Sequence, residues 1–95
     1  MRYKIYIHEE NDDVGVAITD LGEGDQVKAK VLKSEDTVEK EVGVKEDVPL
    51  THKVALVDME KGHEVIEYDE VIGEATENIK AGEHVHTHNI KSIKV

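Results

Sequence analysis

The sequence predicts a small all-β domain that is mostly strand with little helix. Val and Ile number 14 and 8 against 4 Leu, and β-branched side chains favour strands. Apolar and polar residues also alternate with a period of two along most of the chain, and the only helix that we allow for is a single turn within 76–80. A chain of 95 residues forms one domain with a modest core, so we expect residues 1–95 to fold as a unit.

Turns rich in Gly, Asp, Asn and Pro separate the expected strands. The first strand is expected at 3–8, with Tyr3, Ile5 and Ile7 on one face. Further strands are expected at 14–18, 27–32, 38–45, 52–57, 64–68, 71–76, 84–88 and 90–95. After two polar residues, 52–57 is apolar on both faces, which is typical of a strand buried on both sides and predicts the centre of the fold. We identify no internal repeat.

The charge of the chain excludes some classes of function. Lys and Arg number 12 against 22 Asp and Glu, which gives a net charge of −10, and the acidic residues are spread along the chain. Nucleic-acid binding is not expected, because it needs clustered cations and stacking aromatic side chains, and neither is present. The same charge repels a small anionic substrate unless a bound metal or a partner's cation reverses the local field.

The composition also indicates a compartment. The chain has no cysteine, so disulfides and thiolate metal sites are excluded and a reducing environment is expected. No apolar run approaches the ~20 residues of a membrane-spanning helix, and the start, Met1 to Tyr6, lacks the apolar core of a signal peptide. We therefore expect a cytoplasmic protein without membrane association.

Three of the 6 histidines alternate within residues 82–89, which read Gly-Glu-His-Val-His-Thr-His-Asn. On a strand, His84, His86 and His88 would share one face. Neutral imidazole is the commonest protein metal ligand, so this string predicts a divalent-metal site. The outer rings of a straight strand would lie roughly 13 Å apart, so we expect two of the three rings to bind one ion with a further ligand from elsewhere. The alternative is that all three are surface polar residues.

Two further candidates are His52 and Lys53, at the polar start of the segment 52–57. The alternative for His52 is a hydrogen bond at the strand end. An imidazole that does not bind metal suits general acid or base catalysis near neutral pH. A hydrolytic triad is not expected, because the chain has neither Cys nor a Gly-x-Ser-x-Gly motif. So small a chain has few walls for a cavity of ~300–1,000 Å³, and we expect it to supply half a site.

Several stretches together point to a family. They are His52 to Leu56, Gly62 to Ile66, Ile72 to Thr76, Gly82 to Asn89, and the opening His8 with Asn11 to Ala17. In these stretches the chain resembles the N-terminal module of the altronate and galactarate dehydratases, an SAF-type domain with a β-clip fold. The resemblance covers nearly the whole chain, and the string that ends in His86, Thr87, His88 and Asn89 is its most specific part.

The resemblance implies a small subunit, or an N-terminal-type module, of a metal-dependent hydro-lyase that dehydrates a sugar acid such as altronate or galactarate. It implies Fe²⁺ or Mn²⁺ as the metal, a separate large dehydratase subunit as the partner and a small anionic hydroxy acid as the substrate; a homo-oligomer is a further expectation. The residues carried over are His86 and His88 as catalytic, His52, Lys53 and Asn89 as substrate-binding, and His84, His86 and His88 as metal ligands.

The chain also departs from the family pattern. Glu67, Tyr68 and Asp69 stand where the family tends to have Lys-Tyr-Gly, and Thr51 replaces a glycine before His52. If Glu67 and Asp69 point into the site, they would repel an anionic substrate. Two alternatives therefore stay open. One is the small subunit of a (2R)-sulfolactate sulfo-lyase, which eliminates sulfite instead of water, and the other is a non-catalytic metal- or partner-binding SAF module.

Overall fold

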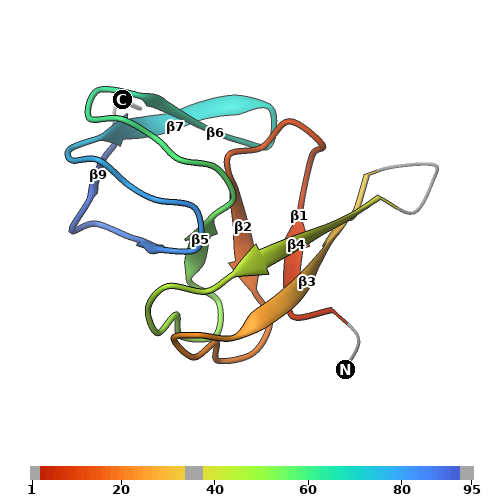
Figure 1. Ribbon diagram of the computed structural model, residues 1–95. Helices are drawn as coiled ribbons and strands as arrows, with labels where there is room; N and C mark the ends of the chain where they lie inside the picture. The colour runs from red at the N-terminus through yellow and green to blue at the C-terminus, as the bar shows by residue number, and fades with distance from the viewer. Residues whose placement is uncertain (1–2, 34–37, 93–95) are drawn as a thin grey trace.

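The computed structural model describes residues 3–33 and 38–92, which form two β-sheets (Figure 1). The strands are β1 (Ile5–Ile7), β2 (Val14–Ala17), β3 (Gln26–Val31), β4 (Glu39–Gly43), β5 (Lys53–Ala55), β6 (Glu64–Glu67), β7 (Glu70–Ala75), β8 (His84–Val85) and β9 (Ile90–Lys91). One sheet has the order β4-β3-β1-β2-β5-β8, and the other has the order β6-β7-β9. The all-β prediction is confirmed: none of the described residues is helical, so this part of the chain has no helix that could cross a membrane.

Most of the predicted strands are observed with shorter bounds, and β3 and β7 keep the predicted length but begin one residue earlier. Two expectations need correction. The expectation of one strand over 84–88 is wrong, because β8 ends at Val85 and the chain turns. The helical turn within 76–80 is also wrong, because Ile79 forms a β-bridge with Met59 instead. Of the strand expected at 90–95, Ile90–Lys91 is observed, and residues 93–95 lie outside the described residues.

The core consists of two apolar clusters, and β5 lies between them. Val54 belongs to the cluster around β1, β3 and β4, whereas Ala55 belongs to the cluster around Val65 and Val85. Val54 and Ala55 are each 0 % exposed, which confirms the burial predicted for both faces of this strand. In the sheet β5 pairs with β2 on one side and β8 on the other, while the β6-β7-β9 sheet lies at the far end of the molecule from β3 and β4 (Figure 1).

A turn of eight residues occurs four times, and inspection of the sequence missed this repeat. Each copy begins with Asp or Asn, continues with an apolar residue, has a positive φ at its fifth residue and ends in a buried Val. The copies are residues 20–27, 47–54, 58–65 and 78–85. They lead into β3, β5, β6 and β8 respectively, so each turn places one strand.

The four turns associate as two reciprocal pairs. The side-chain oxygen of each first residue accepts a hydrogen bond of 2.8 to 3.0 Å from the backbone N–H of its partner's fourth residue. The donor and acceptor pairs are Leu50 with Asp20, Glu23 with Asp47, Ala81 with Asp58 and Lys61 with Asn78. The second residues form the bridges Leu21–Val48 and Met59–Ile79. Because each turn is tied to its partner twice, the start of each following strand is fixed in space.

The fifth residue of the turn needs a left-handed backbone conformation. Gly24, Gly62 and Gly82 adopt φ values of 92° to 94°, but Thr51 occupies this place in the 47–54 turn with φ 75°. A left-handed conformation costs a residue with a Cβ roughly 1–2 kcal/mol, and β-branched residues rarely adopt it. The strained residue directly precedes His52, so the strain lies beside the candidate site.

Thr51→Gly is expected to raise the free energy of unfolding by about 0.5–1 kcal/mol. It relieves a backbone strain of roughly 1–2 kcal/mol, which exceeds the ~0.5–1 kcal/mol of extra unfolded-state entropy that glycine brings. Urea unfolding measures the change. Gly62→Thr is the matched control, because a Cβ there meets nothing within 4 Å, and it should destabilise the protein. A Thr51→Gly protein less stable than the wild type would contradict the strain at this turn.

Candidate functional site

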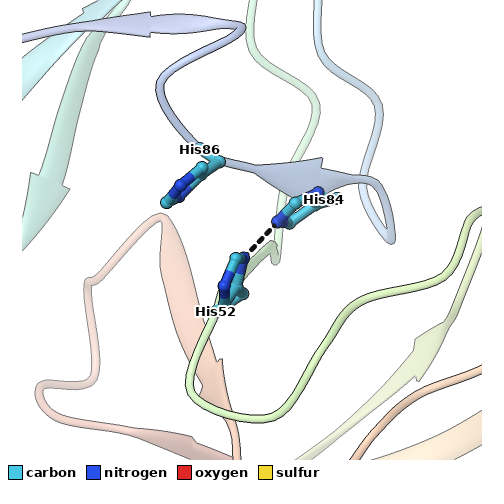
Figure 2. A group of neighbouring side chains, drawn as sticks. All are labelled: His52, His84 and His86. Carbon is cyan, nitrogen blue, oxygen red and sulfur yellow. Dashed lines mark hydrogen bonds between the residues drawn. The ribbon is translucent and has the colours of Figure 1, made fainter.

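The 47–54 and 78–85 turns bring His52 and His84 together from distant parts of the sequence. β5 and β8 pair antiparallel with Val54 opposite His84, and His52 lies immediately before β5. His52 Nδ1 and His84 Nε2 are 2.8 Å apart (Figure 2). Both side chains are half-buried. A hydrogen bond between two imidazoles requires that one of these nitrogens carries a proton and the other does not.

His86 completes a group of three rings. Its ring centroid lies 4.6 Å from that of His52 and 5.6 Å from that of His84, in stacked arrangements. Figure 2 shows the three rings gathered where the chain leaves β8. One ring nitrogen from each residue lies within 4.8 Å of the others. The structure therefore joins two rings of the histidine string with a third from elsewhere, as the sequence predicts; metal binding itself stays a prediction.

The turn after β8 depends on Asn89, which is 3 % exposed. Its Oδ1 accepts a bond from the backbone N–H of His86 at 3.0 Å, and its Nδ2 donates to the carbonyl of His84 at 2.9 Å. These bonds end the strand early and fold the histidine string back on itself. The observed role of Asn89 is thus to hold His84 and His86 in place. Substrate contact by Asn89 stays a prediction, with both ends of its amide already bonded to the backbone.

His88 projects from the same turn and is exposed. Its ring centroid is 5.3 Å from that of His84. On a straight strand these rings would be more than twice as far apart, at roughly 13 Å, so the turn is what makes them neighbours. His84 is therefore the ring that contacts His52, His86 and His88.

The Lys53 side chain lies beside a buried acid. Its Nζ is 3.7 Å from Oε1 of Glu67, whose side chain is 7 % exposed. Oε2 of the same carboxylate is 3.7 Å from Nε2 of His8, and the His8 ring stacks on Tyr68 at 3.8 Å. Of the two acids that depart from the family pattern, Glu67 points inward and binds Lys53, whereas Asp69 is exposed.

A depression of about 270 Å³ adjoins the histidines. Lys53 and His86 line it together with the apolar side chains of Ile72, Val85 and Ile90. It is open to solvent and smaller than the ~300–1,000 Å³ of most ligand pockets, so by itself it offers one wall of a site. A larger hollow of about 710 Å³ runs along the 58–65 turn, but none of the predicted site residues lines it.

The environment of His84 favours its neutral form. Burial lowers the pKa of His84 below its ordinary value of 6.5, and His52, His88 and His86 lower it further by charge repulsion, while Glu46 opposes them. An uncharged imidazole offers a lone pair, and this is the form that binds metal ions.

The three-ring group suits a divalent ion. Neighbouring ligands on a tetrahedral ion at ~2.1 Å lie about 3.4 Å apart, so His52 Nδ1 and His84 Nε2, now 2.8 Å apart, would have to separate slightly once their shared proton leaves. Three imidazole donors without cysteine are compatible with Zn²⁺, Fe²⁺ or Mn²⁺.

Glu46 is a neighbour of the site that inspection of the sequence missed. Its Oε1 accepts a hydrogen bond of 2.8 Å from the backbone N–H of His84. It stands between Lys45 and Asp47 in a charged stretch with no ligand spacing to mark it. The pattern of the 78–85 turn, by contrast, can be recognised in the sequence, because Asn78, Gly82 and Val85 stand at its first, fifth and eighth positions. This pattern predicts where β8 begins.

With this geometry established, sequence comparison assigns a family. The chain is a small all-β domain with a histidine cluster at the ends of two paired strands, and residues 3–93 match the altronate/galactarate dehydratase SAF domain. The chain belongs to this family. The predicted family resemblance is thereby confirmed.

The relatives have two different architectures. The chain is 34 % identical to the (2R)-sulfolactate sulfo-lyase subunit alpha of Chromohalobacter salexigens over 97 % of both chains. It is also 41 % identical to altronate dehydratase of Escherichia coli over 85 % of this chain and 33 % identical to that of Bacillus subtilis over 97 %. The matched segments make up only 15 % and 17 % of those two dehydratases. The chain is thus homologous both to a short subunit and to one part of a much longer enzyme.

His84→Gln should flatten the pH dependence of stability. The folded-state pKa of His84 is below its ordinary value of 6.5, so below pH 6.5 the unfolded chain binds a proton more readily than the folded one. This contribution to stability is complete above that pH and is lost as the pH falls toward the folded-state value. With a chelator present, the Tm of the wild type should therefore drop more between pH 7.5 and 5.5 than that of the variant. Equal drops would contradict the shift.

Proposed function

We propose that this chain is the small subunit, or module, of a metal-dependent hydro-lyase that dehydrates a sugar acid such as altronate or galactarate together with a separate large catalytic chain. The observation that carries the proposal is its relationship to altronate dehydratases, of which it matches 15 % and 17 %, and to a subunit alpha that it matches nearly end to end. A domain that is part of a long enzyme in one case and a separate subunit in another is expected to need the remaining part for activity.

The histidine cluster supports the metal dependence. His84 and the rings around it would hold the divalent ion, for which Fe²⁺ and Mn²⁺ are the candidates. When bound, such an ion supplies Lewis acidity to a carboxylate and an adjacent hydroxyl of a hydroxy acid. A ring of the cluster that does not hold the ion, His86 or His88, could move a proton as a general acid or base, because both are exposed.

Lys53 is the cation of this chain best placed to meet a substrate carboxylate, because it lines the depression beside His86. Its ammonium is shared with Glu67 at 3.7 Å, so a substrate carboxylate would compete with an internal one. The depression is open to solvent, and the large chain would supply its other walls.

A second candidate function is elimination of sulfite from a sulfonated hydroxy acid. It is favoured by the relative of the same length, which is a sulfo-lyase subunit alpha and aligns over 97 % of both chains. The domain would serve both reactions in the same way, since each removes a proton from the carbon next to a carboxylate and expels the leaving group, water or sulfite, from the following carbon.

The activity test is reconstitution of the chain with the large lyase chain encoded in the same genome. The complex should dehydrate an aldonate or aldarate in the presence of Fe²⁺ or Mn²⁺, whereas neither chain alone should do so. Sulfite release from sulfolactate by the same complex would identify the second candidate. A complex that forms, binds metal and turns over neither substrate class would favour a non-catalytic module.

His84→Ala should lower the affinity of the chain for divalent metal by about tenfold or more, because His84 contacts every other ring of the cluster. Calorimetric titration measures the loss. His63→Ala is the matched control, because His63 pairs with Asp13 at 2.9 Å and is outside the cluster. Unchanged affinity in His84→Ala would contradict the assignment of the metal to these histidines.

A further inference from the structure

The histidine cluster contains a second group of ligand atoms. One atom each from Glu46, His84 and His88 lies within 4.8 Å of the others, as is also true of His52, His84 and His86. We call the first group the carboxylate set and the second group the histidine set. His84 belongs to both.

Glu46 is placed beside His84 by packing of the chain that follows β4. At Gly82 an added Cβ would lie 1.9 Å from the carbonyl oxygen of Gly43, so only glycine permits this close approach. Lys45 then donates its backbone N–H to the carbonyl of Gly82 at 2.9 Å. The next residue, Glu46, accepts the backbone N–H of His84 through Oε1. A carboxylate has two oxygens, so Oε2 can bind an ion while Oε1 keeps this bond.

The two sets differ in ligand chemistry. Three imidazoles are a donor set typical of Zn²⁺. Two imidazoles and one carboxylate, with open positions, are the donor set of mononuclear ferrous sites, and carboxylate oxygen also suits Mn²⁺. His88 is exposed and Glu46 is only partly buried, which leaves room for water or substrate oxygen on an ion in the carboxylate set.

We propose that the cluster has two overlapping metal-binding positions with different preferences: the histidine set selects Zn²⁺, and the carboxylate set holds Fe²⁺ or Mn²⁺ and makes Glu46 a ligand of the functional ion. The inference rests on the proposed function in one respect, namely that this cluster binds a divalent metal. It goes further by naming the ligands that select the metal.

The two positions exclude one another because they share His84. A neutral imidazole carries one protonated nitrogen and only one nitrogen with a free lone pair, so it serves one ion at a time. Zn²⁺ in the histidine set therefore removes His84 from the carboxylate set, and excess Zn²⁺ displaces Mn²⁺ from the protein.

The test compares Mn²⁺ and Zn²⁺ binding by the full chain and two variants. Zn²⁺ binds most nitrogen-containing sites more tightly than Mn²⁺, so the informative quantity is the ratio of wild-type to variant affinity for each metal. Glu46→Gln keeps an oxygen for the His84 N–H but loses the charge. It should weaken Mn²⁺ binding about tenfold or more and change Zn²⁺ binding by less than about threefold. His86→Ala should do the reverse. Glu60→Gln, at an exposed glutamate elsewhere, should change neither.

The electron paramagnetic resonance signal of free Mn²⁺ reports the competition directly. One equivalent of Zn²⁺ should release the bound Mn²⁺ from the wild type. Equal weakening of both metals by Glu46→Gln, no effect of that variant on Mn²⁺, or retention of Mn²⁺ beside bound Zn²⁺ would overturn the two-position proposal. If His84→Ala leaves the binding of both metals intact, the cluster is not the metal site and both proposals fail. The outcomes named above overturn the two-position proposal alone, so the two failures are distinguishable.

Discussion

The bonds between the four eight-residue turns are the constraint on which this structure depends. In each turn a side-chain oxygen of Asp or Asn accepts a hydrogen bond from a backbone N–H of the partner turn. Short strands of two to six residues have few ladder bonds of their own. Tying each turn to a partner fixes the start of the following strand, so a small domain without disulfides can hold a defined arrangement of loops.

This constraint also creates the candidate site. His52 is the sixth residue of one turn and His84 the seventh of another, and the two turns belong to different pairs. The pairing of β5 with β8 brings them into contact, and Asn89 then folds the rest of the string back toward them. Burial and neighbouring rings lower the pKa of His84, so this ring is a neutral donor in a chain of net charge −10. If the proposed dication binds there, it would offset the negative charge that otherwise repels an acid substrate.

The buried Glu67 shows how one departure from the family pattern is accommodated. A buried carboxylate requires partners, and Lys53 and His8 lie within 4 Å of it. The following residues, Tyr68 and Asp69, both have positive φ, and the buried Asp12 accepts both of their backbone N–H groups. The negative charge is therefore part of an internal ion pair. Glu67 would therefore affect substrate binding mainly by partly neutralising Lys53, and less by repelling the substrate directly.

The sequence alone determined the fold class, most strands, the burial of Val54 and Ala55 on opposite faces, and the family, because period-two alternation and a specific histidine string are local patterns. It did not give the end of β8, the absence of a helical turn at 76–80, the partner of Glu67 or the place of Glu46. Those were decided by the tertiary structure, because each depends on contacts between residues 14 or more positions apart or on a side chain, such as that of Asn89, that competes for backbone bonds. Local alternation cannot encode which distant turns meet, and it is their meeting that turns alternating histidines into a cluster.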